Sequence, residues 1–120
     1  METHGKILSE ALQDLKGVRL YSVEFVMDYV QLHFGGPTLT AYTHPSLKVN
    51  GRTITWDVPG FKDSLCSLIG VPITEVHIVK EELRLDFEKD VTLAVSLRDE
   101  DYSGPEALQF VSDSGPSWIV

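Results

Sequence analysis

The sequence contains an internal repeat, and this repeat limits the possible folds more than any other feature. Residues 12–34 align with residues 65–87 at a constant offset of 53 positions, with eight identities in 23 positions. The identities fall on apolar and turn positions, where a fold constrains the sequence most strongly. We therefore expect a single domain over residues 1–120, built from two similar units at about 4–57 and 58–120.

Each unit begins with a stretch that is typical of a short helix. Apolar residues recur at helical spacing over residues 7–15 and again over residues 61–69. Gly17 and Gly70 follow these two stretches, at the place where a glycine commonly ends a helix. The sequence therefore predicts one helix at the start of each unit.

The rest of each unit alternates between apolar and polar residues, which is the pattern of half-buried strands. Val30, Leu32 and Phe34 are expected to face inward in the first unit, and Leu83 and Leu85 in the second. The predicted strands span about 18–26, 29–34, 39–41 and 53–56 in the first unit, and 71–79, 82–87, 91–97, 107–111 and 117–120 in the second.

One helix with a short meander of strands cannot cover both faces of its own sheet. Two such units can cover their apolar faces by stacking face to face. We therefore predict a β-rich α+β fold, made of two tandem α-β-β-β-β repeats related by a pseudo-twofold axis. It should contain two helices and either two antiparallel sheets or one continuous barrel-like sheet.

The chain is acidic, with a net charge of −8 from 10 basic and 18 acidic residues. The excess lies in the second half, because residues 61–120 have a net charge of −7. Nucleic-acid binders neutralise phosphates with basic side chains, and anionic membrane surfaces also attract basic segments. The composition therefore argues against nucleic-acid and membrane partners and favours a basic protein partner.

The start of the chain and its single cysteine favour a cytoplasmic location. The first residues lack a charged region followed by a long apolar run, and no apolar stretch approaches the roughly 18 residues that cross a bilayer. Cys66 is the only cysteine, so the chain cannot form an internal disulfide. We expect Cys66 to be a small core residue in a protein of the reducing cytoplasm.

The sequence lacks the motifs of catalytic, cofactor and metal sites. It has no phosphate-binding glycine loop and no serine nucleophile elbow. Its histidines, His4, His33, His44 and His77, lack the spacing of a metal site. We therefore expect no catalytic residue, no cofactor and no metal. The alternative is an enzyme or small-ligand binder with a pocket between the units near His33, His44 or His77.

Acidic residues gather on the turns and outward faces of the second unit. The outward positions 29, 31 and 33 of the first unit carry no acidic residue, whereas Glu82 and Asp86 occupy two of the corresponding positions. This divergence indicates either a recognition surface or a solvated acidic edge. Trp56 and Trp118 are anchors of such a surface or core residues. The candidate partner-binding residues are Glu82, Asp86, Glu88, Asp99, Glu100 and Asp101.

Four segments carry a family resemblance: Leu15–Gly17, Val23, Val30–Phe34 and Gly104–Ala107. With them, the chain resembles a group of small bacterial duplicated α+β domains of unknown function. In size, acidity and lack of catalytic motifs, it is also similar to the immunity proteins that accompany secreted bacterial toxins, including those of contact-dependent growth inhibition. This resemblance implies a protein-binding inhibitor, and it carries over no functional residue.

We therefore expect an inhibitor, not an enzyme, that binds a basic toxin domain such as a nuclease through an acidic face. Acidic groups would steer the association and occupy a site built for phosphates. The alternative is a structural or adaptor module, for example a homodimer formed through a sheet edge at Trp118–Val120.

Overall fold

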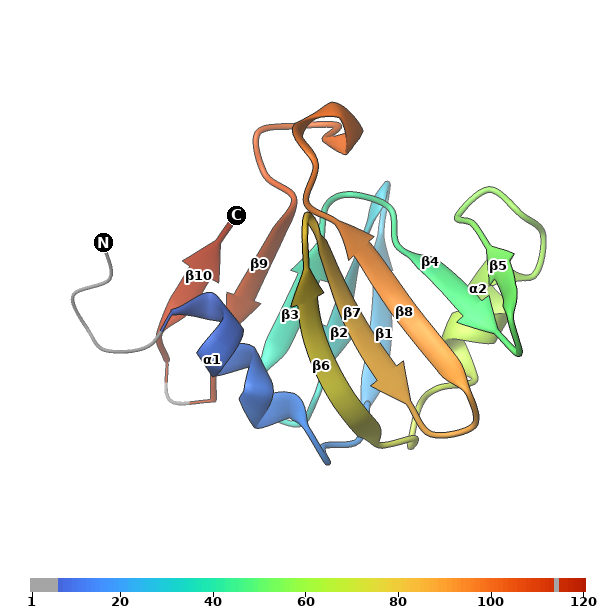
Figure 1. Cartoon of the computed structure of the whole chain (residues 1–120), viewed down its shortest axis with the longest axis horizontal. Coiled ribbons are helices and arrows are strands. Elements are labelled where there is room, and N and C mark those ends of the chain that lie inside the picture. The colour runs from blue at the N-terminus through green and yellow to red at the C-terminus, as the bar shows by residue number, and fades with distance from the viewer. Residues whose placement is uncertain (1–6, 114) are drawn as a thin grey trace.

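The computed structural model describes residues 7–113 and 115–120. Residues 4–6, where we expect the first unit to begin, lie outside this part, and so does His4. Two antiparallel five-stranded sheets face each other, with one helix at each side (Figure 1). In spatial order, sheet 1 contains β1 (Ser22–Val26), β2 (Tyr29–His33), β3 (Thr38–Ala41), β9 (Leu108–Val111) and β10 (Ser117–Ile119), and sheet 2 contains β5 (Arg52–Ile54), β4 (Ser46–Val49), β8 (Val91–Ser96), β7 (Glu82–Phe87) and β6 (Ile73–Val79).

The predicted α+β fold with two antiparallel sheets and two helices is confirmed, but each sheet combines strands from both halves of the chain. β3 is followed by β4 in the opposite sheet, where β4 pairs with β8. β8 is in turn followed by β9, which returns to sheet 1 and pairs with β3. Each half therefore supplies three consecutive strands to one sheet and two to the other. The expectation that each unit stacks on the other as a sheet of its own is wrong.

Five strands follow each helix, as predicted for the second half, whereas only four were predicted in the first half. The strand that was not predicted in the first half is β4, which pairs with β5 on one side and β8 on the other. Its four residues contain only one fully buried apolar side chain, Leu47, between Pro45 and the Asn50-Gly51 turn. A strand this short shows too little alternation to be recognised from its sequence.

Both predicted helices are present and short. α1 (Leu8–Leu12) continues into a single 3-10 turn, η1 (Gln13–Leu15), and lies against β6. α2 (Phe61–Cys66) lies against β1 and β4. The two helices therefore cover the gaps at the sides of the sandwich. No helix in the described part of the chain has the length and apolarity needed to cross a membrane.

Cys66 is exposed, so the expectation of a core cysteine is wrong. It is the last residue of α2 and directly follows Leu65, which is fully buried. Consecutive residues on a helix point about 100° apart, and here this rotation turns Cys66 away from the face that Leu65 buries. Leu65 and Phe61, four positions apart, form the buried face of this helix.

One hydrophobic core fills the space between the sheets. The predicted inward residues of β2 and β7 are confirmed, because Val30, Leu32, Leu83 and Leu85 are all fully buried. Burial of a leucine or valine side chain contributes about 1.5–3 kcal/mol to the free energy of folding. Trp56 and Trp118 pack against this core while remaining partly exposed, together with Leu8, Val18, Val23, Phe25, Val49, Ile54, Leu97 and Val120.

The first strand of each half begins later than predicted. The sequence predicts strands from residues 18 and 71, whereas β1 begins at Ser22 and β6 at Ile73. The preceding residues pair with each other instead, in isolated bridges between Arg19 and Pro72 and between Leu20 and Ile69. The two halves are therefore joined by main-chain hydrogen bonds before each enters its sheet.

Candidate functional site

Four connections meet at one end of the sandwich, at the top of Figure 1. They are the β1–β2 turn, the β6–β7 turn and the two crossovers between the sheets. We define the acidic end as residues 27–28, 42–45, 80–82 and 97–107. Its only Lys and Arg residues are Lys80 and Arg98, against seven carboxylates: Asp28, Glu81, Glu82, Asp99, Glu100, Asp101 and Glu106.

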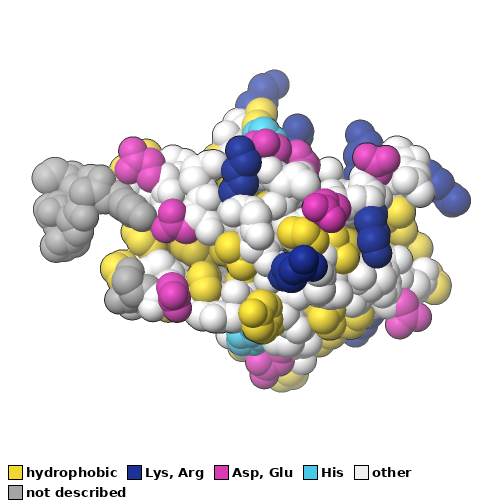
Figure 2. Space-filling view, turned by 90° about the horizontal axis from the view of Figure 1, so that it is seen from below, with side chains coloured by type: hydrophobic (Ala, Val, Ile, Leu, Met, Phe, Trp, Pro, Cys, Tyr) yellow, Lys and Arg dark blue, Asp and Glu magenta, His cyan; other side chains and the backbone are white. Residues whose placement is uncertain are grey.

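The opposite end of the sandwich carries a balanced charge. Figure 2 shows it from below, with positive, negative and hydrophobic side chains interspersed. Among the described residues of its connections, positive charge comes from Lys16, Arg19 and Lys89, and negative charge from Glu88, Asp90 and Asp113. The excess negative charge of the chain is therefore concentrated at one end of the fold.

The two crossovers differ in length. The β3–β4 crossover occupies residues 42–45, whereas the β8–β9 crossover occupies residues 97–107. The longer crossover contains the 3-10 turn η2 (Asp99–Asp101) and has no buried residue before Ala107. Its middle, residues 98–106, extends from the scaffold without contributing to the core, which is typical of a segment with a binding role.

A depression of about 560 Å³ lies where the longer crossover meets the end of β7. Charged side chains of both signs line it, and several are already paired. Arg84 Nε donates to Glu82 Oε1 at 2.7 Å, and the Ser96 hydroxyl donates to Asp101 Oδ2 at 2.6 Å. Arg98 pairs with Glu100. Exposed pairs of this kind contribute about 0–1 kcal/mol to stability, but they fix the side chains in place.

A second depression, of about 460 Å³, continues along the outer face of sheet 2. Ala94 lies in the middle strand β8, directly between Ser46 and Arg84 on the neighbouring strands. Because Ala94 and Ser46 are small and the surrounding side chains are long, the face is hollow at this point. Lys48 and His77 lie on its rim.

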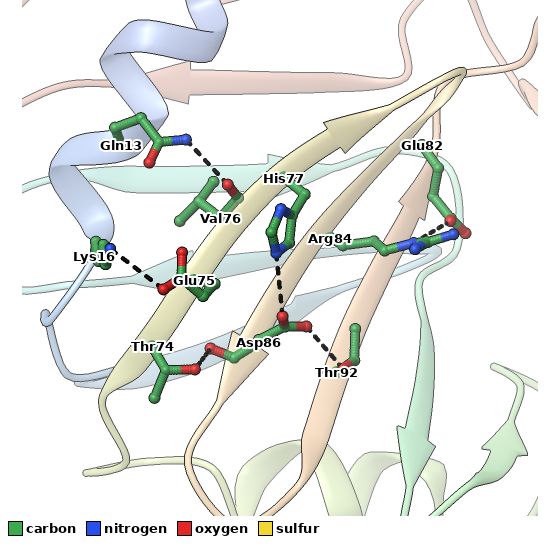
Figure 3. Close-up of polar contacts among 10 residues, drawn as sticks. All are labelled: Gln13, Lys16, Thr74, Glu75, Val76, His77, Glu82, Arg84, Asp86 and Thr92. Carbon is green, nitrogen blue, oxygen red and sulfur yellow. Dashed lines mark hydrogen bonds and ion pairs between the residues drawn. The ribbon is translucent and has the colours of Figure 1, made fainter.

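A row of three side chains crosses the outer face of sheet 2 (Figure 3). His77 on β6 lies with Nε2 at 3.3 Å from Asp86 Oδ2 on β7, and the Thr92 hydroxyl on β8 donates to Asp86 Oδ1 at 2.9 Å. Asp86 is therefore held from both sides, and its charge is partly satisfied within the sheet. At the edge of the same sheet, Lys16 pairs with Glu75 at 3.3 Å.

Sheet 1 carries a corresponding row on its outer face, in which the histidine, and not the acid, is the middle residue. His33 Nε2 lies at 3.2 Å from Glu24 Oε1, and His33 Nδ1 lies at 3.3 Å from the Thr38 hydroxyl. In the sequence alignment, Glu24 corresponds to His77, and His33 to Asp86. The same two aligned positions therefore hold an acid–histidine pair in both halves, with the acid and the histidine exchanged.

The described histidines do not share a pocket. His33 and His77 lie on the outer faces of opposite sheets, and His44 stacks on Trp56 with ring centroids 4.3 Å apart. His44 Nε2 also lies at 2.7 Å from the backbone oxygen of Asp28. Within residues 7–113 and 115–120, no group of three or more His, Cys, Asp and Glu side chains is placed to hold a metal ion.

The structure brings four of the six predicted partner-binding residues together. Glu82 is the first residue of β7, and Asp99, Glu100 and Asp101 form η2, so all four belong to the acidic end. Asp86 lies farther along the outer face of sheet 2, in the row with His77 and Thr92. Glu88 lies beyond the other end of β7, in the β7–β8 turn, about 20 Å from Glu82 along the strand.

Sequence reasoning missed three carboxylates of the acidic end: Asp28, Glu81 and Glu106. Asp28 and Glu81 were visible as aligned turn residues, which places both at the same end of their sheets. Glu106 lies in the Gly-Pro-Glu segment of the longer crossover. Only the paired order of the strands brings that segment next to the β1–β2 turn.

Comparison with protein families, with curated proteins and with solved structures finds no match for this chain.

Proposed function

We propose that this protein is a binding protein without chemistry of its own, and that its acidic end docks a basic protein partner. The observation that carries the proposal is the β8–β9 crossover, residues 97–107. It extends beyond the core, it is longer than the corresponding crossover of the first half, and it holds four of the seven carboxylates of the acidic end. Charge concentrated in this way accelerates association with an oppositely charged surface.

A narrower form of the proposal is that this protein is an immunity protein of the cytoplasm. It would neutralise a basic bacterial toxin, for example a nuclease. The size and acidity of the chain support this form. The exposed thiol of Cys66 supports the location, since the reducing cytoplasm keeps exposed thiols from oxidising. Asp99 and Glu81, which are both exposed, would then face the cationic groups with which the toxin binds its substrate.

Capture of partners from the native cell at low and at high salt tests the proposal. The bait is the whole chain, compared with the variant Glu81→Lys/Asp99→Lys, which reverses two exposed charges of the acidic end. We expect a basic protein in stoichiometric amount, released by salt and lost from this variant. A partner that is retained equally by the variant would remove the acidic end from the proposal.

The matched control is Glu88→Lys/Asp90→Lys. It changes the net charge by the same amount at exposed positions of the opposite end, in the β7–β8 turn. We expect this variant to capture the partner as the original chain does. Equal loss from both variants would show that net charge, rather than the acidic end, holds the partner.

We also propose that the fold is a duplication of one unit, in which each copy lends its last two strands to the other copy's sheet. Two strand orders support this: β1-β2-β3-β9-β10 and β6-β7-β8-β4-β5 correspond element by element. The positive φ angles of Met27 (49°) and Lys80 (57°), which are aligned turn residues, support it as well. A pseudo-twofold axis would relate the two copies.

Main-chain hydrogen bonds between the halves support this relation. The Gly17 amide donates to the Ile73 oxygen at 2.7 Å, and the Gly70 amide donates to the Leu20 oxygen at 2.6 Å. These two bonds exchange places when each residue is replaced by its aligned counterpart 53 positions away. The Ile73 amide donates to the Val18 oxygen, and the Leu20 amide donates to the Val71 oxygen. These two bonds form a second pair of the same kind.

A second candidate function is self-association through β10. This strand is the edge of sheet 1, and Ile119 on it is 56% exposed. A free strand edge with an exposed apolar side chain can pair with another chain. Sedimentation over a concentration series checks this: a dimer that Ile119→Lys abolishes would support it, and a monomer at all concentrations would exclude it.

A further inference from the structure

A small hollow of about 260 Å³ lies at the acidic end, on the side of sheet 1. The β1–β2 turn and the longer crossover form its walls, and the rings of Tyr29 and Tyr42 belong to its lining. Its size is below the roughly 300–1,000 Å³ of sites for small-molecule ligands. It is large enough for one side chain of a partner. The lining residues are Asp28, Tyr29, Tyr42, Ser103, Gly104, Pro105 and Glu106.

The two tyrosines give the hollow two aromatic walls. Tyr29 is the first residue of β2, and Tyr42 directly follows β3, so the two rings lie side by side on neighbouring strands. Their centroids are 5.2 Å apart, and the ring planes meet at 50°. The Tyr42 hydroxyl reaches Gln109 Oε1 at 3.5 Å. The two rings therefore pack against each other, and both line the hollow.

Within residues 7–113 and 115–120, the two carboxylates of this hollow have no basic partner. Asp28 and Glu106 form no ion pair with any residue in the described part of the chain, in contrast to Glu82 and Glu100 in the neighbouring depression. Burial raises the pKa of Tyr42, and the negative charge of Glu106 raises it further, followed by a smaller effect of Tyr29. The hollow therefore has a negative charge that no described side chain neutralises by an ion pair.

Aromatic faces combined with unpaired carboxylates are the chemistry that binds an organic cation. We propose that the hollow between Tyr29, Tyr42, Asp28 and Glu106 receives one lysine or arginine side chain of the basic partner. The cation lies against the two rings and forms charge-assisted hydrogen bonds with the carboxylates. This proposal rests on the proposed function and names the anchor point within the acidic end.

The test uses the whole chain and three short peptides: acetyl-Gly-Lys-Gly-amide, its arginine analogue and its glutamine analogue. Binding is followed by NMR on the ring signals of Tyr29 and Tyr42. We expect the lysine and arginine peptides to shift these signals with millimolar affinity, while the neutral glutamine peptide does not. The relative affinities of the two cationic peptides identify which side chain fits better. Equal binding of the glutamine peptide would overturn the proposal.

Variants of the lining give a second readout. Tyr29→Leu and Glu106→Gln should each weaken binding of the cationic peptides by about two- to thirtyfold, the range of one cation–π or charged contact. The matched controls are Tyr21→Leu and Asp90→Asn, which remove an exposed ring and an exposed carboxylate at the opposite end. Affinities that fall equally in lining and control variants would show non-specific attraction and overturn the proposal.

The outcomes for this hollow and for the proposed function can be distinguished. Peptide binding that depends on Tyr29, with no basic partner captured from the cell, would support the cation site and contradict the docking function. The opposite outcome is a partner that is lost from the variant Glu81→Lys/Asp99→Lys and retained by both Tyr29→Leu and Glu106→Gln. This outcome would support the docking function and contradict the cation site.

Discussion

Arg19 and Pro72 lie opposite each other in an isolated antiparallel bridge, although 53 positions separate them in the chain. This separation equals the offset of the sequence repeat. The bridge lies where the segments leading into β1 and β6 pass each other, and the Arg19 side chain adds a hydrogen bond from Nη1 to the Gly70 oxygen at 2.7 Å. The halves are thus joined at one point by direct pairing and elsewhere by exchanged strands.

Because the sheets share strands, neither half should fold by itself. The exposed segment 57–60 between β5 and α2 is a suitable place to divide the chain. We expect fragments 1–57 and 58–120 to be unfolded separately, and to assemble on mixing into a one-to-one complex with the NMR spectrum of the intact chain. A fragment that is folded and monomeric without its partner would contradict the exchange of strands as a requirement for folding.

Leu32 and Leu85 occupy aligned positions on β2 and β7, and both are fully buried. Replacing either by alanine leaves a cavity in the shared core, so we expect each variant to lose about 2–5 kcal/mol of the free energy of unfolding. Denaturant unfolding measures this loss. Met27→Ala, at a side chain that is 95% exposed, is the control and should change stability by less than about 0.5 kcal/mol.

Met27 and Lys80 adopt positive φ angles of 49° and 57°, a backbone conformation that is strained for methionine and lysine and free of strain for glycine. We expect Met27→Gly and Lys80→Gly each to raise the free energy of unfolding by about 0.5–1 kcal/mol, since relief of strain exceeds the entropy cost of glycine. Asp28→Gly and Glu81→Gly change the adjacent turn residues, whose φ angles are not positive. These two variants should lower the free energy of unfolding. Thermal unfolding compares the four variants.

Tyr42 should make stability depend on alkaline pH. Its pKa is raised above the ordinary value of 10.0 in the folded chain, first by burial and then by Glu106 and Tyr29. The unfolded chain therefore loses this proton at lower pH than the folded chain, so stability falls as the pH rises through about 10. Tyr42→Phe should reduce this fall, as measured by unfolding over a pH series. An unchanged slope in the variant would contradict the assignment.

The helices and most strands could be predicted from the sequence because their periodicity is a local property. Helical spacing predicted both helices, although α1 and α2 end at Leu12 and Cys66, several residues before the expected glycine caps. The alternation around Leu32 and Leu85 identified the inward faces. The exchange of strands could not be predicted in this way. Leu47 and Leu108 both face inward. Alternation would be the same if their strands had joined the opposite sheets, because it does not specify which strand lies beside them.

The acidic end was only partly predictable for a related reason. Glu82 and the run Asp99–Asp101 are close in sequence to strands of the second half, and their charge was evident. Asp28 and Tyr29 come from the first half, and they meet Glu106 only because β9 returns to pair with β3. A site assembled by a long-range pairing leaves no local signal in any of its segments.

The longer crossover has a consequence for how this protein can evolve. Residues 98–106 contribute no buried side chain, while the core lies in the strands on both sides. Substitutions, insertions and deletions in this loop therefore cost little folding free energy and are tolerated readily. If the acidic end docks a partner as proposed, a lineage can change its binding specificity there while selection on the core continues, so that recognition and foldability are inherited as nearly separate traits.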